Sequence, residues 1–285
     1  MPGTLLKIKE VFNNLNKTEK RIAEYILENP DDIIHLSIGE LAERCSTSQA
    51  AIVRFCKSIQ YNGYKDFKID ITPDILALQK DDENKYTDIK PGDKLESIIE
   101  NVCINNIKSI DDTLKILDYN EVKRAVDAIN KSRRIDFYGV GASGIIALDG
   151  QQKFMRIHKY CFAYTDSHLQ ITSAATLEKG DVAIIISYSG ETKDIIESAK
   201  AAKESGATVI SITKYGKSTL SELSNINLFL TSPETSIRSG AMGSRIAQLN
   251  MIDIIFSAVA SMEYKDIKKY LDKTHKATLL KKYNK

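Results

Sequence analysis

The sequence predicts an all-α helix-turn-helix domain followed by an α/β domain with a doubly wound, mostly parallel five-stranded sheet. Residues up to about 77 show helical periodicity and no convincing strand. After about residue 134, short β-rich runs alternate with helix-length segments. A polar segment containing Pro91-Gly92 lies between these regions. We therefore expect a first domain at residues 1–77, a linker at 78–94 and a second domain at 95–285.

The composition is that of a globular protein, with 42% hydrophobic and 27% charged residues. No run approaches the ~18 apolar residues of a membrane-spanning helix, and the N-terminus lacks an apolar signal segment. We expect a cytoplasmic location and no membrane role. The cysteines are too widely spaced for a metal or disulfide pattern, so we expect reduced thiols, no metal and no cofactor. They are Cys45, Cys56, Cys103 and Cys161.

Three capping-box-like pairs mark helix starts in the N-terminal region. The pairs are Asn16 with Glu19, Ser37 with Glu40, and Ser46 with Gln49. The second and third predicted helices are joined by a very short turn, because SIGELAERC runs straight into STSQAAIVRFCKSI. Two helices joined so closely must cross steeply, which predicts a helix-turn-helix.

The second helix of that motif carries side chains suited to the major groove of DNA. Glutamine pairs with adenine and arginine with guanine, while hydroxyls and N–H groups at a helix N-terminus bind phosphate. The predicted DNA-binding residues are Ser46, Thr47, Ser48, Gln49, Ala50, Arg54 and Lys57.

In the segments LNKTEKRIAEYILENP, SIGELAERC, TSQAAIVRFCKSI and YNGYKDF, residues 5–77 resemble the N-terminal domain of RpiR-type (MurR/RpiR) regulators. The resemblance implies transcription regulation through double-stranded DNA. Gln60 departs from the family pattern, which usually has glycine after the recognition helix. The departure predicts a shifted helix end.

An amphipathic helix is predicted directly after the linker, because its apolar residues recur at the helical period. They are Leu95, Ile98, Ile99, Val102, Ile107, Ile110, Leu114 and Leu117. We expect this face to pack against the second domain or a partner subunit. A homodimer or homotetramer with two-fold symmetry would bind an inverted-repeat operator.

The second domain is predicted to contain short buried strands separated by helices, which indicates a parallel sheet. The strands are expected at Ile135–Tyr138, Val182–Ser187, Thr208–Thr213 and Ile226–Leu230, with a weaker one at Cys161–Tyr164. Lys265–Lys285 is predicted to form a solvated terminal helix.

Two loops rich in glycine and serine follow predicted strands. GVGASG spans Gly139–Gly144 and precedes a helix expected to start near Ile145, while SYSGET spans Ser187–Thr192. Such loops place hydroxyls and backbone N–H groups at a helix N-terminus, where an anion is favoured. By itself GVGASG also fits a dinucleotide site, with Asp166 as the ribose-binding acid. The second serine-rich loop favours a phosphate site over this alternative.

With GxGxS, SxSGxT and the strand GATVISIT, residues 119–262 resemble the sugar isomerase (SIS) domain. The resemblance implies that Ser187, Ser189, Gly190 and Thr192, together with Ser143, bind the phosphate of a phosphorylated sugar or amino sugar. Such an effector would control genes of carbohydrate metabolism. Arg238, Ser239 and Arg245 are expected at the border of the pocket or at a dimer contact.

SIS domains also occur in isomerases and etherases, which need a base near the reacting carbons. Glu191, Glu234 and His168 are candidates by location alone. The fused helix-turn-helix favours a sensor, so we expect no enzyme activity and no catalytic residue.

Overall fold

The computed structural model describes residues 3–78, 92–232, 241–262 and 264–279. Contacts divide the chain into two units. Unit 1 comprises residues 1–116 with 215–217 and 231–235, and unit 2 comprises 117–214 with 218–230 and 236–285. Most of the predicted linker lies outside the described residues, and the predicted domain boundaries stay a prediction.

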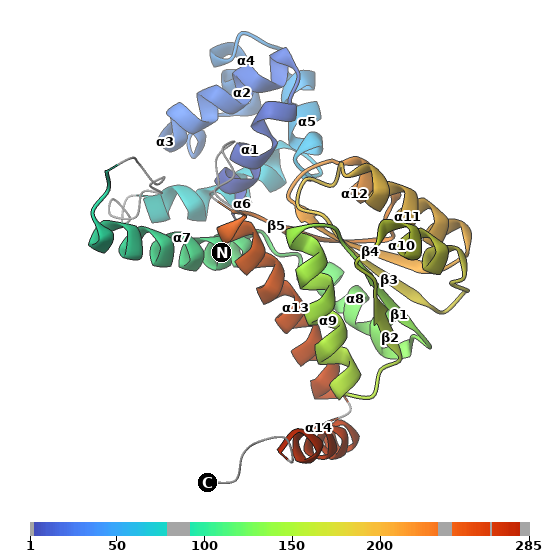
Figure 1. Cartoon of the computed structure of the whole chain (residues 1–285). Coiled ribbons are helices and arrows are strands. Elements are labelled where there is room, and N and C mark those ends of the chain that lie inside the picture. The colour runs from blue at the N-terminus through green and yellow to red at the C-terminus, as the bar shows by residue number, and fades with distance from the viewer. Residues whose placement is uncertain (1–2, 79–91, 233–240, 263, 280–285) are drawn as a thin grey trace. The chain divides into compact units, whose positions relative to one another are not determined.

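Unit 1 is built from helices, as the periodicity predicted (Figure 1). They are α1 (Thr4–Val11), η1 (Phe12–Asn14), α2 (Lys17–Glu28), α3 (Pro30–Ile33), α4 (Ile38–Arg44), α5 (Gln49–Ser58), α6 (Tyr64–Leu78) and α7 (Leu95–Ile116). Leu41, Ala42 and Ile52 are buried where α4 and α5 meet. Phe55 and Phe67 pack edge to face at 6.3 Å and join α5 to α6.

Two of the three predicted helix caps are confirmed. Asn16 and Ser37 form capping boxes at the starts of α2 and α4. The third was wrong, because Ser48 is the N-cap of α5. Ser46 instead ends α4 with a left-handed φ of 48°. Its N–H donates to Glu43 and the next N–H donates to Ala42, which is the Schellman pattern of a helix C-terminus.

The apolar stripe of α7 lies at the surface of unit 1. Leu95, Ile99, Ile107, Ile110 and Leu114 are exposed by 37 to 67%. Side chains of α7 that are buried include Ser109, Asp112, Thr113 and Ile116. The helical period was therefore predicted correctly, while the apolar face stays largely exposed among the described residues of unit 1.

Unit 2 contains a five-stranded sheet in the order β2-β1-β3-β4-β5, with every pairing parallel. The strands are β1 (Ile135–Tyr138), β2 (Cys161–Ala163), β3 (Val182–Ile186), β4 (Thr208–Lys214) and β5 (Ile226–Leu230). The helices are α8 (Tyr119–Lys131), α9 (Ala142–Arg156), α10 (Ser167–Ala175), α11 (Lys193–Glu204), α12 (Thr219–Leu223), α13 (Met242–Met262) and α14 (Tyr264–Leu279). The predicted fold class is confirmed.

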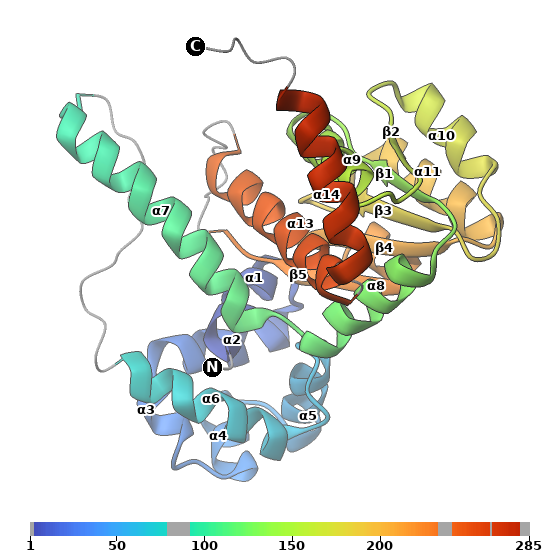
Figure 2. The same ribbon diagram turned by 90° about the horizontal axis from the view of Figure 1, so that it is seen from below.

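Helices cover both faces of the sheet because alternate strand residues point to opposite sides. On β3, Ile184 and Ile186 join the core formed with α8, α9 and α13. Ala183 and Ile185 join the core formed with α10 and α11. Both views show α9 beside α13 on one face (Figure 1 and Figure 2). Each fully buried isoleucine contributes about 1.5–3 kcal/mol to stability.

Hydrogen bonds to a buried carboxylate tie β1 to α10. The Asp136 carboxylate is fully buried and accepts two hydrogen bonds of 2.8 Å from Arg134, one of 2.8 Å from Tyr138 and one from Ser173. The hydrogen bonds to Asp136 raise the pKa of Arg134, and burial raises the pKa of Tyr138. With four donors around it, the carboxylate is well compensated for its loss of water.

No single helix in the described part of the chain is long and apolar enough to cross a membrane, and α13 with α14 reaches that level only as a pair bent by 116°. Over the same residues, no group of three or more His, Cys, Asp or Glu side chains is placed to hold a metal ion.

Gln60 follows α5 in the left-handed region, with a φ of 70°. Its N–H donates to Lys57 and that of Tyr61 donates to Cys56, so Gln60 occupies the position that usually carries glycine. The predicted shift of the helix end was therefore wrong, and Gln60 takes the glycine position at the cost of backbone strain.

Gln60→Gly should stabilise the protein by about 0.5–1 kcal/mol, because glycine adopts this φ without strain. Thermal unfolding would report the gain as a rise of a few degrees in Tm. Gln60→Ala is the matched control, since alanine keeps the strain and should give no rise. An unchanged or lower Tm for Gln60→Gly would contradict the assignment.

Candidate functional site

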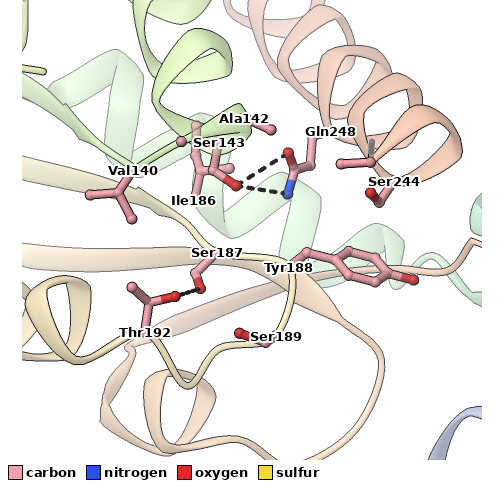
Figure 3. A pocket seen from close by; sticks show the side chains of 12 residues that line it. Val140, Ala142, Ser143, Ile186, Ser187, Tyr188, Ser189, Thr192, Ser244 and Gln248 are labelled. Atoms are coloured by element: carbon pink, nitrogen blue, oxygen red, sulfur yellow. Dashed lines mark hydrogen bonds between the residues drawn. The ribbon is translucent and has the colours of Figure 1, made fainter. Parts of the chain in front are cut away.

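A pocket of about 270 Å³ lies at the carboxyl ends of β1 and β3 (Figure 3). The two strands are neighbours, but β1 continues into α9 on one face of the sheet and β3 continues into α11 on the other. Their following loops therefore diverge and leave a crevice, as expected at a topological switch point. The lining residues are Val140, Gly141, Ala142, Ser143, Ile186, Ser187, Tyr188, Ser189, Thr192, Ala241, Ser244 and Gln248.

The first wall of the pocket is the start of α9. Gly141 precedes the helix with φ 59° and ψ −130°, a conformation that only glycine adopts readily. Because the chain turns so sharply, α9 begins at Ala142 and places Ser143 in its first turn. The expected start near Ile145 was wrong by three residues.

The second wall is the loop Ser187–Thr192, which leads into α11. The Ser187 and Thr192 hydroxyl oxygens are 3.3 Å apart, and the Ser189 hydroxyl accepts a hydrogen bond of 3.3 Å from the N–H of Glu191. The structure thus brings four of the five predicted phosphate ligands to one pocket, namely Ser143, Ser187, Ser189 and Thr192. Gly190 lies in the turn but is not among the lining residues.

Neither helix at the pocket has a side-chain cap. Asp118, Asp166 and Ser218 cap α8, α10 and α12 of the same unit. At α9 and α11 the N-cap residues, Gly141 and Thr192, make no capping hydrogen bond. The first-turn N–H groups of a helix carry partial positive charge and need an acceptor. Two such helix ends at one cavity favour an anionic ligand.

The third wall comes from α13 and the residue before it, where the sequence analysis expected Arg245 but not the residues that line the pocket. Ala241, Ser244 and Gln248 line the pocket at spacings of three and four residues. The Ser143 hydroxyl lies 3.5 Å from Oε1 and 3.3 Å from Nε2 of Gln248, whose side chain is almost fully buried. The Gln248 amide has two N–H donors and two acceptor lone pairs, and one hydroxyl uses at most one of each, so Gln248 retains capacity to bind a ligand hydroxyl. The sequence pattern that could have identified this wall is the pair of polar residues, Ser244 and Gln248, at helical spacing in an otherwise apolar helix.

The remaining candidates in unit 2 lie elsewhere. Asp166, the proposed ribose-binding acid, accepts from the N–H of Leu169 as the cap of α10. The Glu191 carboxylate binds Thr219, His168 lies exposed on α10, and Arg245 is exposed on α13. None of these four lines the pocket. Glu234, Arg238 and Ser239 fall outside the described residues.

The predicted DNA-binding residues of unit 1 lie along one side of α5 and the turn before it. All are exposed except Thr47, which is half-buried. Ala50, Arg54 and Lys57 repeat at helical spacing, opposite the buried face of α5 formed by Ala51, Ile52, Phe55 and Cys56. The Arg54 and Lys57 side chains make no hydrogen bond or ion pair with any described residue. The amide nitrogen of Gln49 lies near Gly39 of α4.

Other basic side chains nearby are already engaged within unit 1. Arg44 lies 3.6 Å from Asp32 and donates to the Tyr25 hydroxyl, while Lys68 donates to the carbonyl of Leu36. Arg21 of α2 was not predicted, yet its guanidinium donates to the carbonyl of Ser46 at 3.0 Å. This contact places a further cation beside the turn of the helix-turn-helix.

Known protein families match the sequence in both units. A model of the helix-turn-helix domain of the rpiR family matches residues 2–77, and a model of the SIS domain matches residues 128–258. The HTH-type transcriptional regulator TTE0211 of Caldanaerobacter subterraneus subsp. tengcongensis is 45% identical over 284 residues, which is 100% of each chain. The chain belongs to the RpiR family of HTH-type transcriptional regulators.

Further relatives of this RpiR-family regulator match over nearly its whole length. HexR of Pseudomonas aeruginosa is 32% identical, with 99% of this chain and 98% of that protein covered. The solved structure of Vibrio vulnificus NanR complexed with ManNAc-6P has a TM-score of 0.63 and 28% identity, with 99% of this chain and 100% of that chain covered. The protein is thus a transcriptional regulator with a helix-turn-helix domain and a SIS domain.

Proposed function

We propose that the SIS domain senses a phosphorylated sugar or amino sugar and that its occupancy changes the affinity of the helix-turn-helix for operators of sugar-metabolism genes. One observation carries the proposal: two helix N-termini without side-chain caps border the same pocket as four neutral hydroxyl side chains. N–H dipoles and hydroxyls are the donors that bind a phosphate group without a full positive charge.

The size and polarity of the pocket support a small polar effector. Its volume of about 270 Å³ is near the lower end of the range of small-molecule sites, about 300–1,000 Å³. Ser244 and Gln248 add polar groups from α13, to which the hydroxyls of a sugar would bind. NanR, which was solved with ManNAc-6P, supports an amino-sugar phosphate as one member of the class.

The described lining supports sensing over catalysis. Isomerisation requires a carboxylate or histidine placed to move a proton between carbons. Among the described residues that line the pocket there is no aspartate, glutamate, histidine or lysine. Of the three candidate bases, Glu191 is held by Thr219, and His168 lies outside the lining.

We further propose that a second copy of the chain covers the exposed stripe of α7. The exposed isoleucines and leucines of this helix form an apolar face, and faces of this kind usually mark protein contacts. A two-fold dimer would present two α5 helices to DNA.

Ser189→Ala should weaken sugar-phosphate binding by about 1.5–3 kcal/mol, because a hydrogen bond to a charged group is lost. Calorimetric titration with a panel of sugar phosphates and their unphosphorylated parents would measure this. Ser205→Ala, at the other end of α11, is the matched control and should bind as the wild type does.

Equal affinity for phosphorylated and unphosphorylated sugars would contradict the phosphate site. Phosphorus NMR of the same mixtures should show each sugar phosphate unchanged. Its conversion by the protein would instead support the isomerase alternative.

Arg54→Ala should reduce discrimination between a selected operator and a scrambled duplex by about 1–3 kcal/mol, the range for one arginine–guanine pair. The operator is obtained by enrichment from a random pool, and both duplexes are titrated by fluorescence anisotropy. Arg44→Ala removes the same charge from a side chain already paired with Asp32, so its effect should be smaller and independent of sequence. Unchanged discrimination by Arg54→Ala would remove Arg54 from the base-reading set.

Footprinting on the same operator should protect two inverted half-sites separated by one helical turn, about 34 Å, or a multiple of it. This spacing follows from two-fold symmetry of a dimer. Protection of a single asymmetric half-site would contradict the dimer.

A further inference from the structure

We propose that Glu191 is a positioning residue that clamps the phosphate-binding loop Ser187–Thr192 onto the first turn of α12. The inference rests on the proposed function in so far as this loop binds phosphate. Glu191 was a candidate catalytic base by location, but its carboxylate is fully engaged in another contact.

Both carboxylate oxygens of Glu191 bind one residue. Oε1 accepts from the N–H of Thr219 at 2.7 Å, and Oε2 accepts from the Thr219 hydroxyl at 2.7 Å. Thr219 is the first residue of α12, so the negative charge also lies at the positive end of that helix. Two short charge-assisted hydrogen bonds fix the direction of the side chain as well as its distance.

The backbone of the loop also contacts the start of α12. The carbonyl of Gly190 accepts from the N–H of Leu220 at 3.0 Å. Gly190 has a φ of 69°, and a Cβ at this position would lie 2.2 Å from the Ser218 hydroxyl oxygen. The turn is thus in direct contact with the start of α12, and only glycine leaves room for it.

Glu191 also reaches the pocket through its own peptide. Its N–H donates to the Ser189 hydroxyl at 3.3 Å, and Ser189 lines the pocket. A displacement of Glu191 would therefore change the orientation of a predicted phosphate ligand. The carbonyl of Tyr188 is held separately by the N–H of Lys214 at 2.9 Å, so Glu191 controls the later half of the loop.

The sign of the effect separates positioning from simple electrostatics. A carboxylate close to an anion site repels the anion, so removal of the charge alone would tighten phosphate binding. If the carboxylate positions the loop, its removal weakens phosphate binding instead. The two accounts predict opposite changes in the same measured Kd.

The test is calorimetric titration of the full chain with inorganic phosphate. Glu191→Ala should raise the Kd about tenfold, since the loss of its charge-assisted hydrogen bonds disorders the loop. Thr219→Val removes only the hydroxyl donor and should raise the Kd by less, with no further effect in the Glu191→Ala background. Thr219→Ser keeps the hydroxyl and should restore wild-type affinity.

Glu204→Ala is the matched control for charge. Glu204 lies exposed in the last turn of α11, away from the pocket, and its carboxylate has no hydrogen bond or ion pair with a described residue. Its removal should leave phosphate binding unchanged or slightly tighter. Equal or tighter binding by Glu191→Ala would overturn the positioning role.

Hydrogen exchange without ligand distinguishes this inference from the proposed function. Glu191→Ala should speed exchange at the amides of Thr219 and Leu220, while Glu204→Ala should not. If the wild-type chain binds neither phosphate nor sugar phosphates, the proposed function is contradicted. Hydrogen exchange would then be the measurement that tests the contact between Glu191 and Thr219. Unchanged exchange at both amides would overturn it.

Discussion

The candidate site depends on one topological constraint, the divergence of the chain at the carboxyl ends of β1 and β3. The two strands are adjacent and parallel, but their helices cover opposite faces of the sheet. The loops cannot fill the space between them, and both following helices start there without a side-chain cap. A feature that would cost stability in an ordinary helix is therefore what the proposed anion site uses.

The two proposed binding surfaces would hold negative charge through different interactions. On α5, Arg54 and Lys57 carry full charges at the exposed surface, and such contacts weaken as salt rises. In the pocket, the described side-chain donors are hydroxyls and the Gln248 amide, and the peptide N–H groups of two uncapped helix starts lie beside them. Fixed dipoles favour the geometry of one phosphate group, whereas exposed cations favour any phosphate backbone. This difference between the pocket and the surface of α5 suits a regulator with a specific effector and a polyanionic target.

The strands could be predicted closely because they are buried on both faces, which makes each one a short apolar run such as VAIII at Val182–Ile186. Helix starts were less predictable where glycine or a left-handed turn decides them. Ser46 looked like a cap but terminates α4, and Gly141 starts α9 three residues before the expected position. Gln248 was missed because its contact with Ser143 spans 105 positions in sequence, and local pattern contains no such information.

The most direct test of the account follows backbone amide NMR signals while a sugar phosphate is added to the ¹⁵N-labelled protein. The central claim is that the N-termini of α9 and α11 bind one phosphate group together. The amides of Ala142 and Ser143 and those of Lys193 and Asp194 should then shift in parallel and saturate at a single Kd. Shifts confined to one helix, or none at either, would contradict the claim.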